Sequence, residues 1–167
     1  MAVEENTDPD RHDRLVAAAS TALAAVKAGE GAGVVGGLAE AASGSEEGKI
    51  DARELMLLLF GECSTMVAAL GQGGTTPVKM QVYDDDGHEV PIDEADPPVR
   101  TAVRTLLAEV HGDTDAASEQ IEIALRNAGP EEMASLMVQA LRWTIKLSAE
   151  CTSRDLPVPE WIAEALA

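Results

Sequence analysis

The segment at residues 78–92 constrains the fold most, because its side chains alternate between apolar and polar on both sides of one turn. Its apolar positions are Val78, Met80, Val82, Val90 and Ile92. Alternation with a period of two is typical of a β-strand that buries one face. The two halves share an apolar face only if Val82 lies opposite Val90, and this register leaves a three-residue loop that ends in Gly87. The pattern predicts a small antiparallel β-hairpin over about residues 78–92.

The rest of the chain has the three-and-four spacing of apolar residues that is typical of helices. Its 167 residues suit one domain, and 46% of them are hydrophobic although only 2% are aromatic. A core with so few aromatic side chains is aliphatic, which suits packed helices better than a β-sandwich. We predict a mainly α fold, an irregular bundle of six to seven helices that carries the hairpin. We expect residues 9–167 to form this single helical domain and residues 1–8 to be a disordered N-terminus.

Capping residues and prolines indicate where the helices begin. The expected first residues are Pro9, Asp51, Pro97, Thr114, Pro130 and Glu160. Asp51 is predicted to cap its own helix, and Asp96 the helix that starts at Pro97. Residues 29–49 contain seven glycines. A short helix over residues 34–42 fits there, but the composition leaves open whether this stretch is ordered.

The helix predicted after Asp51 is apolar on every side at residues 55–60. Such a helix is buried on more than one face. Two interpretations follow: it is the central helix of the bundle, or one of its faces is a seam between two copies of the chain. The residues predicted to form this self-association seam are Leu55, Leu58, Leu59 and Met66.

The chain is strongly acidic, with a formal net charge of −18 from 30 acidic and 12 basic residues. Repulsion disfavours direct binding to a nucleic-acid backbone or to an anionic membrane surface. The N-terminal sequence MAVEENTDPD is not a secretory signal, and the most apolar run, residues 55–70, is too short and too polar for a membrane span. By elimination we expect a cytoplasmic protein. The high negative charge either serves only to keep the protein in solution or attracts a basic partner.

The negative charge is most concentrated in residues 84–96, which we name the acidic segment. Its seven carboxylates are the predicted partner-binding residues Asp84, Asp85, Asp86, Glu89, Asp93, Glu94 and Asp96. Two cations, Arg100 and Arg104, follow one turn apart in the next predicted helix. They either fold back onto the carboxylates at positions 93, 94 and 96 or point into solvent.

Two motifs resemble ligand-binding loops without the required context. Gly31, Gly33 and Gly36 match the dinucleotide pattern GxGxxG, but a predicted helix precedes them where the fingerprint needs a strand. The run at residues 84–87 resembles a calcium loop, but Val82 would occupy the first ligand position and strands would flank it. We interpret these stretches as helix and solvated turn.

The side chains most often used in catalysis are isolated in the sequence. Cys63 and Cys151 lie in predicted helices among apolar residues, where small buried thiols are the default. The three histidines, none with a second histidine or cysteine at ligand spacing, are His12, His88 and His111. The sequence therefore predicts no catalytic, cofactor-binding or metal-binding residue.

Three functions are compatible with these patterns. The first is a non-enzymatic protein–protein interaction or regulatory module whose partner is a second copy of the chain, as a homodimer. It would self-associate through the predicted helix at 51–70 or the one at 130–152. The second is an acidic decoy or inhibitor that binds a basic protein, such as a nucleic-acid-binding protein, through residues 84–96. The third, ranked last, is an enzyme whose site is assembled from dispersed residues, since helical-bundle enzymes usually carry clustered carboxylates or histidines.

Overall fold

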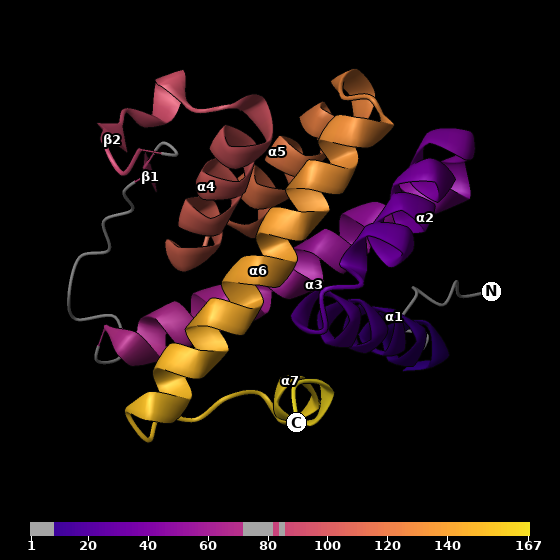
Figure 1. The fold of residues 1–167 in the computed structure, drawn as a ribbon. Helices are drawn as coiled ribbons and strands as arrows, with labels where there is room; N and C mark the ends of the chain where they lie inside the picture. The colour runs from indigo at the N-terminus through magenta and orange to yellow at the C-terminus, as the bar shows by residue number, and fades with distance from the viewer. Residues whose placement is uncertain (1–8, 72–81, 84–85) are drawn as a thin grey trace.

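The computed structural model describes residues 9–71, 82–83 and 86–167, and this part of the chain is mainly helical (Figure 1). It contains seven α-helices, one pair of very short strands and one 3-10 turn. In chain order these elements are α1 (Pro9–Lys27), α2 (Gly31–Gly44), α3 (Glu46–Leu70), β1 (Val82–Tyr83), β2 (Glu89–Val90), η1 (Ile92–Glu94), α4 (Pro97–Val110), α5 (Thr114–Asn127), α6 (Pro130–Ser153) and α7 (Glu160–Ala165). The predicted mainly α fold is confirmed, whereas the disordered N-terminus was predicted for residues that lie outside the described part.

Most helix boundaries follow from local signals in the sequence. The turns after α1 and α4 each contain a glycine in the left-handed region, Gly29 at φ +82° and Gly112 at φ +77°. Glycine adopts this conformation without the steric cost that a Cβ brings. At the start of α5, the Asp113 carboxylate accepts a hydrogen bond of 3.0 Å from the backbone N–H of Ala116. The two glycines end α1 and α4, and Asp113 caps α5, which begins at Thr114 as the sequence predicts.

The glycine-rich stretch at residues 29–49 folds as α2 and the first turn of α3, so the prediction for this region was incomplete. The helix expected to start at Asp51 begins five residues earlier, because the Ser45 hydroxyl accepts a hydrogen bond of 3.0 Å from the backbone N–H of Gly48. Asp51 is therefore inside the helix and caps nothing. Two glycines allow close approach: a Cβ on Gly31 would collide with the Val26 side chain, and one on Gly48 with a backbone carbonyl.

Helix α3 lies at the centre of the bundle and packs against α1, α2, α4, α5 and α6. Helices α3 and α6 cross, with α1 and α2 on one side of the crossing and α4 and α5 on the other (Figure 1). The only phenylalanine, Phe60, is fully buried and meets Trp143 of α6 edge to face, with 6.2 Å between ring centroids. Of the two positions predicted for the most apolar helix, the structure supports the centre of the bundle.

Strands β1 and β2 pair antiparallel in the predicted register, with Val82 opposite Val90. The strands are only two residues long. The rest of the predicted hairpin either lies outside the described residues, at 78–81 and 84–85, or is not strand. Ile92 was expected to extend the second strand and instead begins η1, because Pro91 has no N–H to pair and its carbonyl accepts a hydrogen bond of 2.9 Å from the Glu94 N–H.

The outer surface of the described residues is polar. The large hydrophobic side chains counted as exposed there are Ile50, at 41%, and Ile123, at 38%. No helix among the described residues is long and apolar enough to cross a membrane.

Candidate partner-binding site

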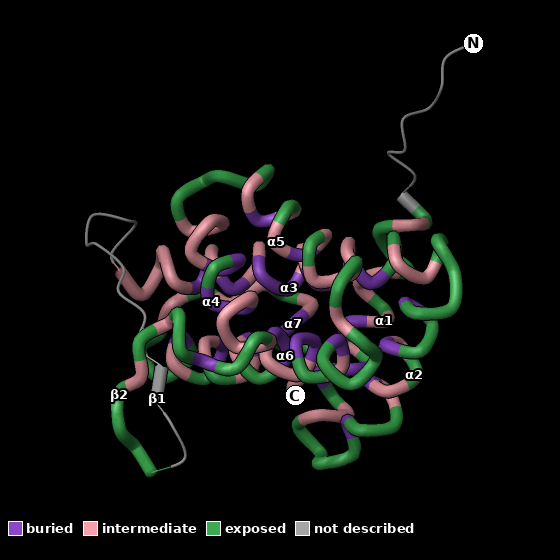
Figure 2. Tube along the Cα trace, turned by 90° about the horizontal axis from the view of Figure 1, so that it is seen from above, coloured by how far each residue is buried: buried purple, intermediate pink, exposed green. Residues whose placement is uncertain are grey.

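The described part of the acidic segment, residues 86–96, contains β2 and lies at the edge of the molecule (Figure 2). Most of these residues are exposed. Five of its seven predicted partner-binding residues lie in the described part of the chain, and all five have exposed side chains. They are Asp86, Glu89, Asp93, Glu94 and Asp96. Asp84 and Asp85 lie outside the described residues.

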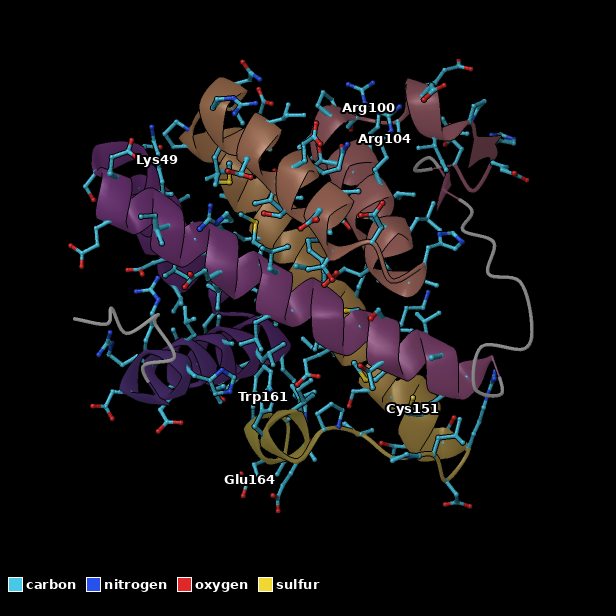
Figure 3. All side chains as sticks on the ribbon, turned by 180° about the vertical axis from the view of Figure 1, so that it is seen from behind. Lys49, Arg100, Arg104, Cys151, Trp161 and Glu164 are labelled. Atoms are coloured by element: carbon cyan, nitrogen blue, oxygen red, sulfur yellow. The ribbon has the colours of Figure 1, made fainter. Side chains whose placement is uncertain are left out.

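Asp93 fastens the acidic segment to helix α4. Arg104 forms an ion pair with the Asp93 carboxylate at 2.5 Å, and the Arg100 guanidinium donates a hydrogen bond of 3.1 Å to the Asp93 carbonyl. The two arginines lie side by side at the end of α4 nearest η1 (Figure 3). Exposed pairs of this kind contribute about 0–1 kcal/mol to stability, so their main effect is to set where the segment lies. Of the two arrangements left open by the sequence, the arginines fold back.

Three other carboxylates of the segment have no partner among the described residues. Among the described residues, the side chains of Glu89, Glu94 and Asp96 form no hydrogen bond or ion pair. Asp96 was predicted to cap α4, but its side chain makes no capping bond. Pro98, at the second helical position, lacks one of the two N–H groups from which a capping carboxylate accepts, and the Asp96 side chain does not use the other. These three charges therefore face solvent.

A cleft of about 310 Å³, which we name the α4–α5 cleft, adjoins the acidic segment. Its walls come from the first half of α4, the second half of α5 and the start of α6, and Arg100 and Arg104 belong to both the cleft and the Asp93 contact. Its apolar lining is Pro97, Pro98, Ile123, Ala124, Ala128 and Leu136. The rest of the lining is polar, so a partly apolar hollow lies next to the most acidic stretch of the chain.

Sequence reasoning missed this cleft, although one signal pointed to it. The inward positions of α5 include Ala117 and Ile121, which are buried, whereas Ile123 lies off that stripe and is exposed. The signal is weak, because single apolar side chains are common on protein surfaces. The cleft itself needs three helices to form, which no local pattern encodes.

The predicted self-association residues are mostly inside the chain. Leu55, Leu59 and Met66 are 3%, 1% and 0% exposed, and Leu58 is half-buried against the core. Leu55, Leu59 and Met66 pack against neighbouring helices of the same chain, whereas Leu58 stays partly exposed. Most of the apolar surface of α3 is thus buried within the chain itself.

The remaining motifs are structural in the described residues. Gly31, Gly33 and Gly36 lie within α2, which follows helix α1 and not a strand, so the geometry of a dinucleotide-binding turn is absent there. No group of three or more His, Cys, Asp or Glu side chains that could hold a metal ion occurs in residues 9–71, 82–83 and 86–167.

The two thiols are buried in the α3–α6 interface region. Burial raises the pKa of Cys63 to about 12, and its sulfur lies 3.3 Å from the Thr144 hydroxyl. Burial also raises the pKa of Cys151. Both cysteines are neutral thiols near pH 7, which makes them poor nucleophiles.

A second hollow, of about 380 Å³, lies between α1, α2 and α3. Its floor is apolar and its rim carries Arg11, which forms ion pairs with Asp51 at 2.9 Å and Glu54 at 2.6 Å. These contacts are the role the structure gives to Asp51 in place of the predicted cap. Because Arg11 is neutralised by two carboxylates, this hollow carries no clear charge preference.

Comparison of the chain with descriptions of known protein families, with curated proteins and with solved structures finds no match.

Proposed function

We propose that this chain is a protein-interaction module that binds a basic partner protein through the acidic segment. The observation that carries the proposal is the arrangement around Asp93. Asp93 is fixed to α4, by Arg104 at its carboxylate and by Arg100 at its backbone carbonyl. Three other carboxylates, at positions 89, 94 and 96, remain exposed and without partners in the described structure. A fixed backbone with free charges suits recognition, because less conformational freedom is lost on binding.

The charge of the whole chain supports the same choice of partner. A net charge of −18 attracts a basic protein over a distance of about 10 Å at ordinary salt and raises the association rate. Complementary charge contributes to rate and specificity more than to affinity. The proposal is close to the decoy function considered from the sequence, without the further claim that the partner is inhibited.

Self-association is less well supported by the described surface. The four side chains expected to form a seam are buried or half-buried in the core, and the two exposed isoleucines lie on different helices, Ile50 on α3 and Ile123 on α5. Neither finding favours a homodimer seam over the acidic segment as the contact surface.

The proposal is tested with a fluorescein-labelled, lysine-rich peptide and fluorescence anisotropy at physiological ionic strength. The triple variant Glu89→Gln, Glu94→Gln, Asp96→Asn removes three exposed charges without touching the Asp93 contact. A matched triple variant, Glu40→Gln, Glu119→Gln, Glu164→Gln, removes three exposed charges elsewhere. We expect the first variant to weaken binding by about tenfold or more and the second to change it by about twofold at most. Equal losses would contradict a defined site, because net charge alone would then explain the binding.

A further inference from the structure

Two residues that line the α4–α5 cleft, Arg100 and Arg104, also contact Asp93 of the acidic segment, and this connection suggests what the partner looks like. We infer that the partner presents one apolar side chain that enters the cleft, flanked by basic residues that meet the exposed carboxylates. This inference rests on the proposed function and adds to it the position and chemistry of an anchor residue.

The size of the cleft suits a single side chain. Pockets that hold drug-sized ligands or cofactors span roughly 300–1,000 Å³, and a cleft of about 310 Å³ is at the lower end of that range. Protein interfaces concentrate their binding energy in a few anchor residues that enter such hollows. The size therefore favours one aliphatic or aromatic side chain over a larger ligand.

The lining is prepared for an apolar group. Ile123 is one of two exposed large hydrophobic side chains in the described residues, and it lines the cleft together with Ala124 and Leu136. Pro97 and Pro98 form part of the opposite wall, and their fixed φ angles keep that wall rigid. Covering Ile123 removes apolar surface from water, which favours binding.

The charges around the cleft favour basic flanks. Four carboxylates lie in its lining or in the neighbouring segment, Asp93, Glu94, Asp96 and Glu132, against the two guanidinium groups of Arg100 and Arg104. The Asp93 carboxylate compensates the charge of Arg104, whereas Arg100 donates only to the Asp93 backbone carbonyl. Glu132 is exposed and has no partner among the described residues. An acidic partner segment would instead meet Glu94, Asp96 and Glu132 as like charges.

The experiment compares three labelled peptides by fluorescence anisotropy with the intact chain. The first is lysine-rich with one central leucine, the second has alanine in place of leucine, and the third has glutamates in place of the lysines. We expect the leucine peptide to bind roughly three to ten times more tightly than the alanine peptide, as for one partly buried aliphatic side chain. We expect the glutamate peptide to show no binding.

Two variants locate the anchor. Ile123→Ala should abolish the preference for leucine over alanine, while Ile50→Ala, which truncates the other exposed isoleucine, should leave it unchanged. Both positions are helical, and alanine favours helix, so both variants should fold. Circular dichroism checks that they do.

The outcomes separate this inference from the proposed function. If both lysine-rich peptides bind equally and binding still depends on residues 89, 94 and 96, the cleft holds no anchor and the inference is overturned while the proposed function stands. If neither lysine-rich peptide binds, the proposed function is overturned, and the inference that rests on it falls with it. A preference for leucine that survives Ile123→Ala, or that Ile50→Ala also removes, overturns the placement in the cleft. Binding of the glutamate peptide overturns the assignment of basic flanks.

Discussion

The indole nitrogen of Trp161 donates a hydrogen bond of 2.7 Å to the Glu62 carboxylate and so joins the C-terminal helix to the centre of the bundle. Trp161 points from α7 toward the bundle, whereas Glu164 on the same helix points away from it (Figure 3). The Lys27 ammonium adds a second contact, from α1 to the Leu166 carbonyl. Within α7, the side chain of Ile162 is fully buried against the bundle. A six-residue helix has little stability of its own, so these contacts hold it in place.

Replacing Trp161 with phenylalanine should release α7. The aromatic ring remains but the donor is lost, and a hydrogen bond to a charged, partly exposed acceptor contributes about 1–2 kcal/mol. We expect unfolding by urea at a correspondingly lower midpoint and faster hydrogen exchange in residues 160–165. Glu62→Gln is the control, because its amide oxygen still accepts the bond and the loss should be smaller. Equal stability of Trp161→Phe and the parent would show that the bond contributes nothing.

Two glycine-to-alanine substitutions should have opposite effects on stability. Alanine at an unconstrained helical position stabilises by about 0.5–1 kcal/mol, and Gly37 in α2 is exposed with nothing near the added Cβ. At Gly48 the same Cβ would collide with the carbonyl oxygen of Ala41. We expect Gly48→Ala to destabilise by about 1–3 kcal/mol because α2 and α3 must move apart.

Thermal and urea unfolding measure the stability of both glycine variants. The predicted result is that Gly37→Ala raises the free energy of unfolding and Gly48→Ala lowers it. Stabilisation by Gly48→Ala would mean that the start of α3 does not lie as close to the end of α2 as the structure places it.

The Glu109 carboxylate should make stability depend on pH. Burial raises its pKa above the ordinary glutamate value, although a hydrogen bond from Thr114 opposes the shift. Between the ordinary and the raised pKa the folded chain holds the proton more tightly than the unfolded chain, so this group's contribution to stability falls as pH rises through that interval. At pH 7 the charged group therefore disfavours the folded state.

Glu109→Gln removes the charge and keeps an oxygen that can accept a hydrogen bond. We expect the variant to be slightly more stable than the parent at pH 7, with the advantage shrinking near pH 4, where the parent is protonated. Glu119→Gln, on the exposed side of α5, controls for the loss of one negative charge. An advantage of Glu109→Gln that is the same at both pH values would contradict the role of burial.

The two thiols should react only when the chain unfolds. Cys63 and Cys151 are fully buried, and burial raises the pKa of each. A thiol reagent such as DTNB at pH 8 should label neither site in the native protein, and both in guanidinium chloride. Single Cys63→Ser and Cys151→Ser variants show which labelling rate belongs to which thiol. Rapid labelling of the native chain would show that the α3–α6 packing opens readily.

Features encoded by neighbouring residues could be predicted from the sequence. Gly29 and Gly112 mark helix ends because the left-handed conformation is a local requirement. The register of Val82 with Val90 follows from alternation and the position of Gly87. Ser45 does not stand out in the sequence as the cap of α3, because the surrounding glycines leave open whether that stretch is ordered. In the structure, Gly31 and Gly48 allow helices to approach closely.

Features that depend on distant residues could not be predicted. An apolar helix surface, as around Leu55 and Leu59, is covered either by the same chain or by a second copy, and only the packing of α3 among its neighbours decides which. The exposed charges of the acidic segment were anticipated, and their fixing at Asp93 was one of two open arrangements. The α4–α5 cleft needs α4, α5 and α6 together, so the position of Ile123 off the buried stripe of α5 is a weak local sign of it.

The most direct test of the account is a map of the binding surface. The isotope-labelled chain is titrated with the leucine-containing, lysine-rich peptide, and amide chemical shifts are followed by NMR. The account predicts that the largest changes fall in residues 86–96 and around Arg100, Arg104 and Ile123. Changes centred on α1 and α2, or spread evenly over the acidic surface, would contradict it.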